Sequence, residues 1–240
     1  MPTKTNILNE GKSKIVYETD DPDLLIIHYK DDATAFNGEK KGTIVDKGVF
    51  NCRISSALFD MLKKAGVPNH VVQNLNEREQ LVRRLQIVPI EYVVRNRIAG
   101  SLARRYGLED GPDLARPMLE FFVKDDDLGD PLIGREAILI LGMATAEALD
   151  EGGAYSLKVN DLLKSFFAEL GISLVDFKLE FGYTADGDLV LADEITPDGC
   201  RLWDAKTGEK MDKDRFRKDL GKVEETYARV ADMVGSALGA

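Results

Sequence analysis

An acid, a base and a second acid alternate with apolar residues in the segment 174–182. Asp176, Lys178 and Glu180 occupy every second position, and the positions between them are apolar. This alternation predicts a β-strand with one apolar face and one charged face. A solvated edge strand would have the same pattern, and that interpretation stays open. Two carboxylates and an ammonium on one face could instead bind a cation and an anion.

The segment that follows brings another acid to the same place. Asp186-Gly187 is a strong signal for a two-residue hairpin turn, and a second apolar run covers residues 188–195. In that register Asp193 lies directly opposite Glu180, where like charges destabilise a sheet. A three-residue loop would shift the register by one position but would keep the two acids adjacent. We expect a cation between them, and such an oxygen site suits Mg²⁺.

Charge and composition exclude several classes of function. The 240 residues carry 32 Lys and Arg against 42 Asp and Glu, a net charge of −10, which disfavours nucleic acid or an anionic membrane as partner. No apolar run approaches the roughly 20 residues that span a bilayer, and no signal peptide is present. Two isolated cysteines are too few for a disulfide framework or a zinc site. We therefore expect a soluble cytoplasmic protein.

Basic residues in this acidic chain are clustered, as in pockets for small anions. Arg95 and Arg97 share one face at the end of a predicted strand, and Gly100 and Ser101 open a short helix. Gly100 lets backbone approach a ligand closely, and Ser101 is expected to cap a helix whose first amides attract anions. The alternative is an ordinary capped helix beside surface arginines. The convergence of charges favours a phosphate or carboxylate pocket.

Two other segments carry chemistry-bearing residues. Gly11-Lys12-Ser13 is not a P-loop, because position 6 is Asn and a β-rich run follows. Lys12 and Lys14 can still reach nucleotide phosphates, as residues near the glycine-rich loops of kinases do. The tight turn 196–204 is expected to hold Arg201 near the acid end of the hairpin. Cys200 in this turn has no predicted base partner, so we interpret it as structural.

The pattern of elements predicts an α+β fold. Residues 1–88 indicate a small antiparallel sheet that carries one helix over 49–65. Residues 89–240 indicate a larger, tightly packed α+β lobe, with helices over 136–141, 144–151, 156–170 and a pair over 212–238.

Five segments, in order along the chain, resemble the signature segments of the SAICAR synthetase family, and the resemblance covers essentially the whole chain. They are Gly-Lys-Ser-Lys at 11–14, Ile-Val-Pro-Ile-Glu-Tyr-Val-Val-Arg at 87–95 with Ala-Gly-Ser at 99–101, Leu-Val-Asp-Phe-Lys-Leu-Glu-Phe-Gly at 174–182, Thr-Pro-Asp-Gly-Cys-Arg-Leu-Trp-Asp at 196–204, and Met-Asp-Lys-Asp-Arg-Phe-Arg at 211–217.

The resemblance implies an ATP-dependent ligase that joins L-aspartate to the carboxylate of carboxyaminoimidazole ribonucleotide, giving SAICAR, ADP and phosphate. It also implies a nucleotide-binding lobe like that of kinases, packed on a larger lobe like that of ATP-grasp enzymes. ATP and Mg²⁺ are the implied co-substrate and metal. A small-molecule kinase and a nucleotide-binding regulatory module remain as alternatives, and a homodimer stays open.

The resemblance assigns roles to individual positions. The residues that the resemblance implies bind ATP are Gly11, Lys12, Ser13, Lys14, Lys124, Glu180 and Asp193. Of these, Glu180 and Asp193 are implied to hold the metal. Residues implied at the imidazole ribonucleotide are Arg95, Ser101, Asp176, Lys178, Arg201 and Arg217, among which Lys178, Asp176 and Arg95 are the expected catalytic residues. Asn37 stands where some family members have aspartate. A role as catalytic base, which such an aspartate could have, is therefore not expected of Asn37.

Overall fold

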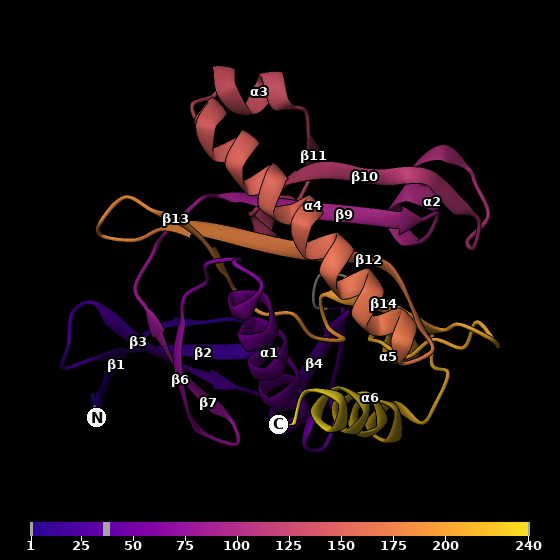
Figure 1. Ribbon diagram of the computed structural model, residues 1–240, viewed down its shortest axis with the longest axis horizontal. Coiled ribbons are helices and arrows are strands. Elements are labelled where there is room, and N and C mark those ends of the chain that lie inside the picture. Colours follow the sequence, from indigo (N-terminus) through magenta and orange to yellow (C-terminus); the bar gives the residue numbers. More distant parts are fainter. Residues whose placement is uncertain (1, 36–38, 240) are drawn as a thin grey trace.

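The computed structural model describes residues 2–35 and 39–239 and shows a mixed α+β fold built mainly on two antiparallel sheets (Figure 1). The α+β fold class predicted from the sequence is confirmed. Asn37 lies outside the described residues.

The first sheet comes from the start of the chain, as predicted. Its strand order is β1-β2-β3-β7-β6, and every neighbouring pair is antiparallel. Its apolar side chains pack against α1, which lies in front of the sheet in Figure 1. A two-stranded antiparallel ribbon, β4 with β5, lies between β3 and α1. These elements are β1 Lys4–Glu10, β2 Lys14–Thr19, β3 Leu24–Tyr29, β4 Asp32–Ala35, β5 Lys40–Thr43, α1 Lys47–Lys64, β6 Val71–Asn76 and β7 Glu79–Arg83.

The second sheet has seven strands and is organised around its longest strand, β12. The main order is β11-β10-β9-β12-β13, and the short strands β8 and β14 also pair with β12. Strand β10 was not predicted, because Pro117 interrupts its sequence pattern and coincides with a shift in its register with β9. The strands are β8 Gln86–Ile87, β9 Ile90–Arg97, β10 Asp113–Val123, β11 Leu132–Ile133, β12 Ile172–Tyr183, β13 Leu189–Ala192 and β14 Cys200–Asp204.

Helix α4 is a single helix, Ala146–Glu169, where the sequence predicted two. Gly152 and Gly153 favour a break between helices, but Gly152 lies where α4 meets β9. A Cβ on Gly152 would lie 2.8 Å from the ring of Tyr92, whose O–H donates to Ala148 O at 3.0 Å. This glycine therefore serves close packing of the helix on the sheet. The other helical elements are α2 Gly100–Tyr106, the 3₁₀ turn η2 Asp126–Leu128, α3 Arg135–Ile140, α5 Asp214–Arg217 and α6 Val223–Leu238.

Helix α6 packs beside α1 (Figure 1), and a buried polar cluster ties both helices to the loop 193–199 between β13 and β14. Lys47 Nζ lies 2.6 Å from Asp198 Oδ2, and Lys47 is fully buried. Tyr227 of α6 donates its O–H to Asp198 Oδ1 at 2.6 Å, and Asn51 Nδ2 donates to Oδ2 at 3.2 Å. Asp198 thus anchors the loop 193–199 to both α1 and α6.

No helix among the described residues is long and apolar enough to cross a membrane.

Candidate functional site

The charged face of β12 is enclosed by the sheet. Strand β9 pairs with one edge of β12, while β14 and β13 pair in turn with the other edge. Asp176 is 3% exposed and Glu180 is 4% exposed, and Lys178 between them is half-buried. The alternative of a solvated edge strand is therefore wrong.

The turn that joins β12 to β13 has three residues, where the sequence favoured a two-residue turn. Thr184 N donates to Asp188 O at 3.0 Å, which leaves a three-residue loop. Glu180 therefore pairs with Ala192, and Asp193 follows in the left-handed region at φ +61°. The two-residue turn with Asp193 opposite Glu180 is wrong, and the alternative register is confirmed.

Lys178 joins the two acids directly. Its Nζ lies 2.6 Å from Glu180 Oε1 and 3.1 Å from Asp193 Oδ2, and Glu91 Oε1 lies 3.0 Å away. Burial would lower the pKa of Lys178, but Asp193, Glu180 and Glu91 outweigh burial and raise that pKa well above its ordinary value. Lys178 is therefore an ammonium at neutral pH.

Two further lysines balance the acids. Lys14 forms an ion pair with Asp193, and Lys124 Nζ lies 3.1 Å from Glu180 Oε1. Burial would raise the pKa of Asp193, but Lys14 and Lys178 outweigh burial and lower it. Each acid thus faces ammonium groups, so the expected net repulsion between Glu180 and Asp193 is replaced by a charge-balanced cluster.

Asp176 lies between two arginines on the neighbouring strands. The register places Arg95 of β9 and Arg201 of β14 opposite Asp176. Arg95 Nη1 donates to Asp176 Oδ2 at 2.8 Å, and Arg201 Nη1 donates to Oδ1 at 3.1 Å and to Oδ2 at 2.9 Å. Ser101 accepts from Arg95 Nη2 at 2.8 Å and does not cap α2, whose N-cap is Ala99. The predicted capping role of Ser101 is wrong, because its hydroxyl instead helps to position the arginine.

Arg217 reaches the same cluster through Asp214. This buried carboxylate accepts from Arg201 Nε at 3.0 Å and from Arg217 Nη1 at 2.5 Å. Arg95, Arg201 and Arg217, all predicted site residues, are thus linked by hydrogen bonds to Asp176 and Asp214. The sequence signal for Asp214 was its i,i+3 spacing to Arg217, which we did not use.

Two further acids of this cluster, Glu91 and Glu120, were not predicted from the sequence. Glu91 shares the strand face of Arg95, four positions before it, so alternation alone could have indicated it. Glu120 accepts from Arg95 Nε at 2.5 Å, but it lies on β10, which was not predicted.

The loop 11–13 lies at the margin of this cluster. Gly11 N donates to Lys14 O at 2.9 Å, which closes the loop between β1 and β2. Lys12 pairs with Asp126 at 2.6 Å, and its side chain is 41% exposed. The structure therefore brings Lys14 to the acids and leaves Lys12 at the solvent edge.

Five of the predicted site residues, Arg95, Ser101, Asp176, Lys178 and Arg201, line a pocket of about 260 Å³ over β9, β12 and β14. Its lining comprises Glu91, Val93, Arg95, Ser101, Phe122, Asp130, Asp176, Phe177, Lys178, Gly199 and Arg201.

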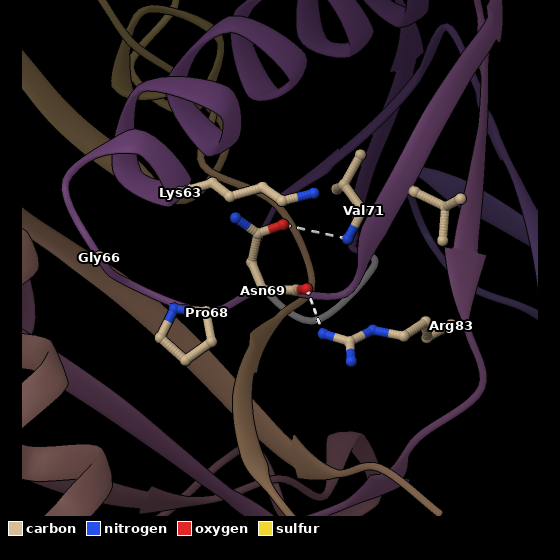
Figure 2. A pocket seen from close by; sticks show the side chains of 7 residues that line it. Lys63, Gly66, Pro68, Asn69, Val71 and Arg83 are labelled. Carbon is tan, nitrogen blue, oxygen red and sulfur yellow. Dashed lines mark hydrogen bonds between the residues drawn. The ribbon is translucent and has the colours of Figure 1, made fainter.

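A larger cavity of about 580 Å³ lies beside the connection from α1 to β6 (Figure 2). Figure 2 shows Arg83 reaching toward Asn69, whose carbonyl oxygen accepts from Arg83 Nη2 at 2.7 Å. The cavity is lined by Lys63, Gly66, Pro68, Asn69, Val71, Val72 and Arg83, and none of the predicted site residues is among them. We therefore assign the chemistry to the smaller pocket.

Neither cysteine is suited to nucleophilic chemistry. Both are free and buried, and burial raises the pKa of Cys52 to about 11 and raises that of Cys200 as well. Burial also lowers the pKa of His70 to about 4, so this histidine is neutral at pH 7. The structural interpretation of Cys200 agrees with these environments.

The acid pair has donors that suit a hard cation. Within residues 2–35 and 39–239, no three His, Cys, Asp or Glu side chains form a ready-made metal site. Glu180 and Asp193 nevertheless present oxygens to one point, which Lys178 Nζ contacts. Glu194 Oε2, buried and without a hydrogen-bond partner among the described residues, lies 3.8 Å from Lys14 Nζ. Carboxylate oxygens are the protein ligands that Mg²⁺ usually takes, together with phosphate oxygens and water.

Comparisons with known proteins agree on one family. A family model described as SAICAR synthetase matches residues 7–234. A phosphoribosylaminoimidazole-succinocarboxamide synthase from Magnetococcus marinus is 55% identical over 230 residues, which are 95% of each chain. The crystal structure of the synthase from Ehrlichia chaffeensis superimposes with a TM-score of 0.93 at 44% identity, covering 96% of this chain and 98% of that one. A SAICAR synthetase in complex with ADP has a TM-score of 0.92 at 42% identity, covering 95% and 97%.

Proposed function

Because this chain belongs to the SAICAR synthetase family, we propose that the cluster around Lys178 is the place where its reaction occurs. The activity of the family is the ATP-dependent ligation of L-aspartate to carboxyaminoimidazole ribonucleotide in purine biosynthesis. The observation that carries the proposed location is the ammonium of Lys178, which contacts Glu91, Glu180 and Asp193 beside the Arg95–Asp176–Arg201 cluster.

The chemistry requires a leaving group on a carboxylate. A carboxylate is a poor electrophile, so we propose that its oxygen first takes the γ-phosphoryl group of ATP, which gives an acyl phosphate and ADP. The amine of aspartate then attacks the acyl carbon and displaces phosphate. Phosphoryl transfer is catalysed mainly by positioning and by neutralisation of charge, which fits a site rich in Lys and Arg.

The residues divide between the two phosphate-bearing substrates. Lys14 and Lys124 are proposed to bind ATP phosphates, with Lys12 and the loop 11–13 closing over them from the edge. Glu180 and Asp193 would hold Mg²⁺, which, when bound, supplies positive charge at the phosphate oxygens. ADP bound to a structural relative supports a nucleotide site in this fold.

The arginines are proposed to bind the ribonucleotide. Arg95, Arg201 and Arg217 offer planar forks suited to phosphate and carboxylate, and Ser101 and Asp176 keep two of these forks in place. Lys178 remains charged and lies between the acids and the arginines, so we propose that it contacts both the accepting carboxylate and the transferred phosphoryl group.

We further propose that residues 1–88 act as the nucleotide lobe and residues 89–240 as the substrate and metal lobe. The first sheet supplies Lys14, and β12 with its hairpin supplies Glu180 and Asp193. Two free thiols suit a reducing cytoplasm, which supports a cytoplasmic location.

Gly100→Ala tests the ribonucleotide site without removing a charge. Gly100 has φ +58°, and a Cβ there would lie 2.4 Å from Arg201 Nη2. The left-handed backbone costs a non-glycine residue about 1–2 kcal/mol, and the guanidinium must also move. We expect KM for the ribonucleotide to rise about tenfold while KM for ATP changes little, as measured by initial rates. Gly107→Ala, also at a positive φ of 65° but with nothing within 4 Å, is the matched control for strain alone.

A coupled ADP-release assay tests the function itself. Each of ATP, L-aspartate and carboxyaminoimidazole ribonucleotide is omitted in turn, and product is separated chromatographically. We expect ADP release to depend on all three and to match SAICAR formed one to one. ADP formed with a stable phosphorylated acceptor and no amide would instead identify a small-molecule kinase.

A further inference from the structure

Lys213 differs from the other cations around the site because it forms no direct ion pair with any residue in the described ranges 2–35 and 39–239. Among the residues that the structure describes, no carboxylate oxygen lies within 4.0 Å of its ammonium, and the structure gives its side chain no hydrogen bond. The two cations near it are paired, Lys47 with Asp198 and Arg217 with Asp214. The other cations of the site pair with the acids described above; they are Lys14, Lys124, Lys178, Arg95 and Arg201.

The position of Lys213 makes this lack of a partner costly. The side chain is half-buried, and its backbone N–H donates to Pro197 O at 3.0 Å. Burial lowers the pKa of Lys213; the charges of Asp198 and Glu194 oppose this effect, and the charges of Arg217 and Lys47 add to it. Lys213 shares the charge of Asp198, because this carboxylate pairs directly with Lys47 and accepts from Tyr227. A half-buried ammonium without a direct ion pair gains from an anionic ligand.

The loop 193–199 connects Lys213 with the reacting centre. Pro197 O accepts from Lys213 N, and two residues later Gly199 O accepts from Lys178 N at 3.1 Å. The same loop begins with Asp193 of the proposed metal site. Lys213 is therefore held by the segment that frames the place where the new bond forms.

We propose that Lys213 binds a carboxylate of L-aspartate. This inference rests on the proposed function, in which Lys14 and Lys124 serve ATP and the arginine forks serve the ribonucleotide. The remaining anionic reactant is a dicarboxylate with one amine. A single ammonium on a flexible stem suits a carboxylate oxygen, whereas the planar forks of Arg201 and Arg217 suit phosphate better.

Lys213→Met is the variant that tests the proposal, with Lys218→Met as control, because Lys218 is exposed at the end of α5 and pairs with Asp110 at 3.5 Å. We expect KM for L-aspartate to rise about tenfold to a hundredfold, and KM for ATP and for the ribonucleotide to stay within about twofold. The inhibition constant of succinate, which has both carboxylates and no amine, should rise by a similar factor.

The pH dependence of succinate inhibition separates binding from packing. Succinate has no amine to titrate, so a loss of inhibition at alkaline pH reports an enzyme group that loses its proton. Because the pKa of Lys213 is lowered, we expect this loss to begin below the ordinary pKa range of lysine. Lys213→Arg should keep the inhibition and remove its alkaline loss, since guanidinium stays charged.

Three outcomes would overturn the proposal. A rise in KM for the ribonucleotide in place of L-aspartate would assign Lys213 to the nucleotide substrate. Unchanged constants for all three substrates in a folded Lys213→Met variant would remove it from the site. Should that variant unfold, an alkaline loss of succinate inhibition that persists in Lys213→Arg would contradict the proposal. In each case, ADP release that still requires all three substrates and matches the amide formed would leave the proposed function intact.

Discussion

Asp193→Asn is expected to lower kcat by about a thousandfold, the loss that follows when roughly 4 kcal/mol of transition-state stabilisation is removed. The substitution removes one of the two carboxylates proposed to hold Mg²⁺ and keeps the size of the side chain. It also removes the partner that fixes Lys14. Initial rates at saturating substrates, with Mg²⁺ varied, measure the effect.

The same variant should be less stable than the parent protein, contrary to what repulsion between the acids alone would predict. Lys14 would keep only Glu194, at 3.8 Å, while Lys178 would keep Glu180 and Glu91. We expect a loss of about 1–3 kcal/mol in the free energy of unfolding, measured by denaturant titration. Asp188→Asn, an exposed position on the same hairpin, is the control. Rates close to those of the control would show that Asp193 is not at the metal.

Arg201→Ala is expected to weaken ribonucleotide binding about tenfold to a hundredfold, because a charged hydrogen bond contributes about 1.5–3 kcal/mol. The affinity for ATP should change little, since Arg201 contacts Asp176 and Asp214 and no residue of the proposed ATP site. Isothermal calorimetry with each ligand measures both affinities.

Folding must be measured alongside binding in this variant. Removing Arg201 leaves Asp214 paired with Arg217 and Asp176 paired with Arg95, so neither carboxylate loses all its partners and we expect a stability loss of about 1–3 kcal/mol. Arg201→Lys keeps the positive charge but loses the planar guanidinium that can bind two oxygens at once. Compared with Arg201→Ala, it should recover more of the free energy of unfolding than of the affinity for the ribonucleotide. Arg229→Ala, at an exposed 3.5 Å pair with Asp204, is the neutral control. Equal losses of affinity for ATP and ribonucleotide would contradict the assignment.

Strong local patterns predicted the parts of the site that lie on single strands. Asp176, Lys178 and Glu180 share a face because of simple alternation, and α1 followed from helical spacing ended by glycine and proline. Arg95 and Ser101 were predicted as neighbours of one ligand and are neighbours in space.

Features set by competition between nearly equal local choices were predicted less well. The hairpin could close over two or three residues, and only tertiary packing selects the register with Glu180 opposite Ala192. The sequence around Gly152 predicts a break between two helices, but α4 continues through it. The ring of Tyr92 occupies the space that a side chain at position 152 would need.

Pairing between distant charges had no sequence signal. Lys14 and Asp193 are 179 positions apart, and nothing local shows that one neutralises the other. For the same reason the repulsion expected between Glu180 and Asp193 was wrong, and Glu120 was overlooked.

Helix α6 has a consequence for how the enzyme matures on the ribosome. Tyr227, which anchors Asp198, emerges after every strand of both sheets has been made. A nascent chain can therefore pair β12 with β9 and β13 while the loop 193–199 still lacks one of its two helical anchors. Catalytic competence should then appear as a late step of synthesis, separate from the formation of the sheets. The synthesis of α6 thus sets the time at which the loop that carries Asp193 becomes rigid.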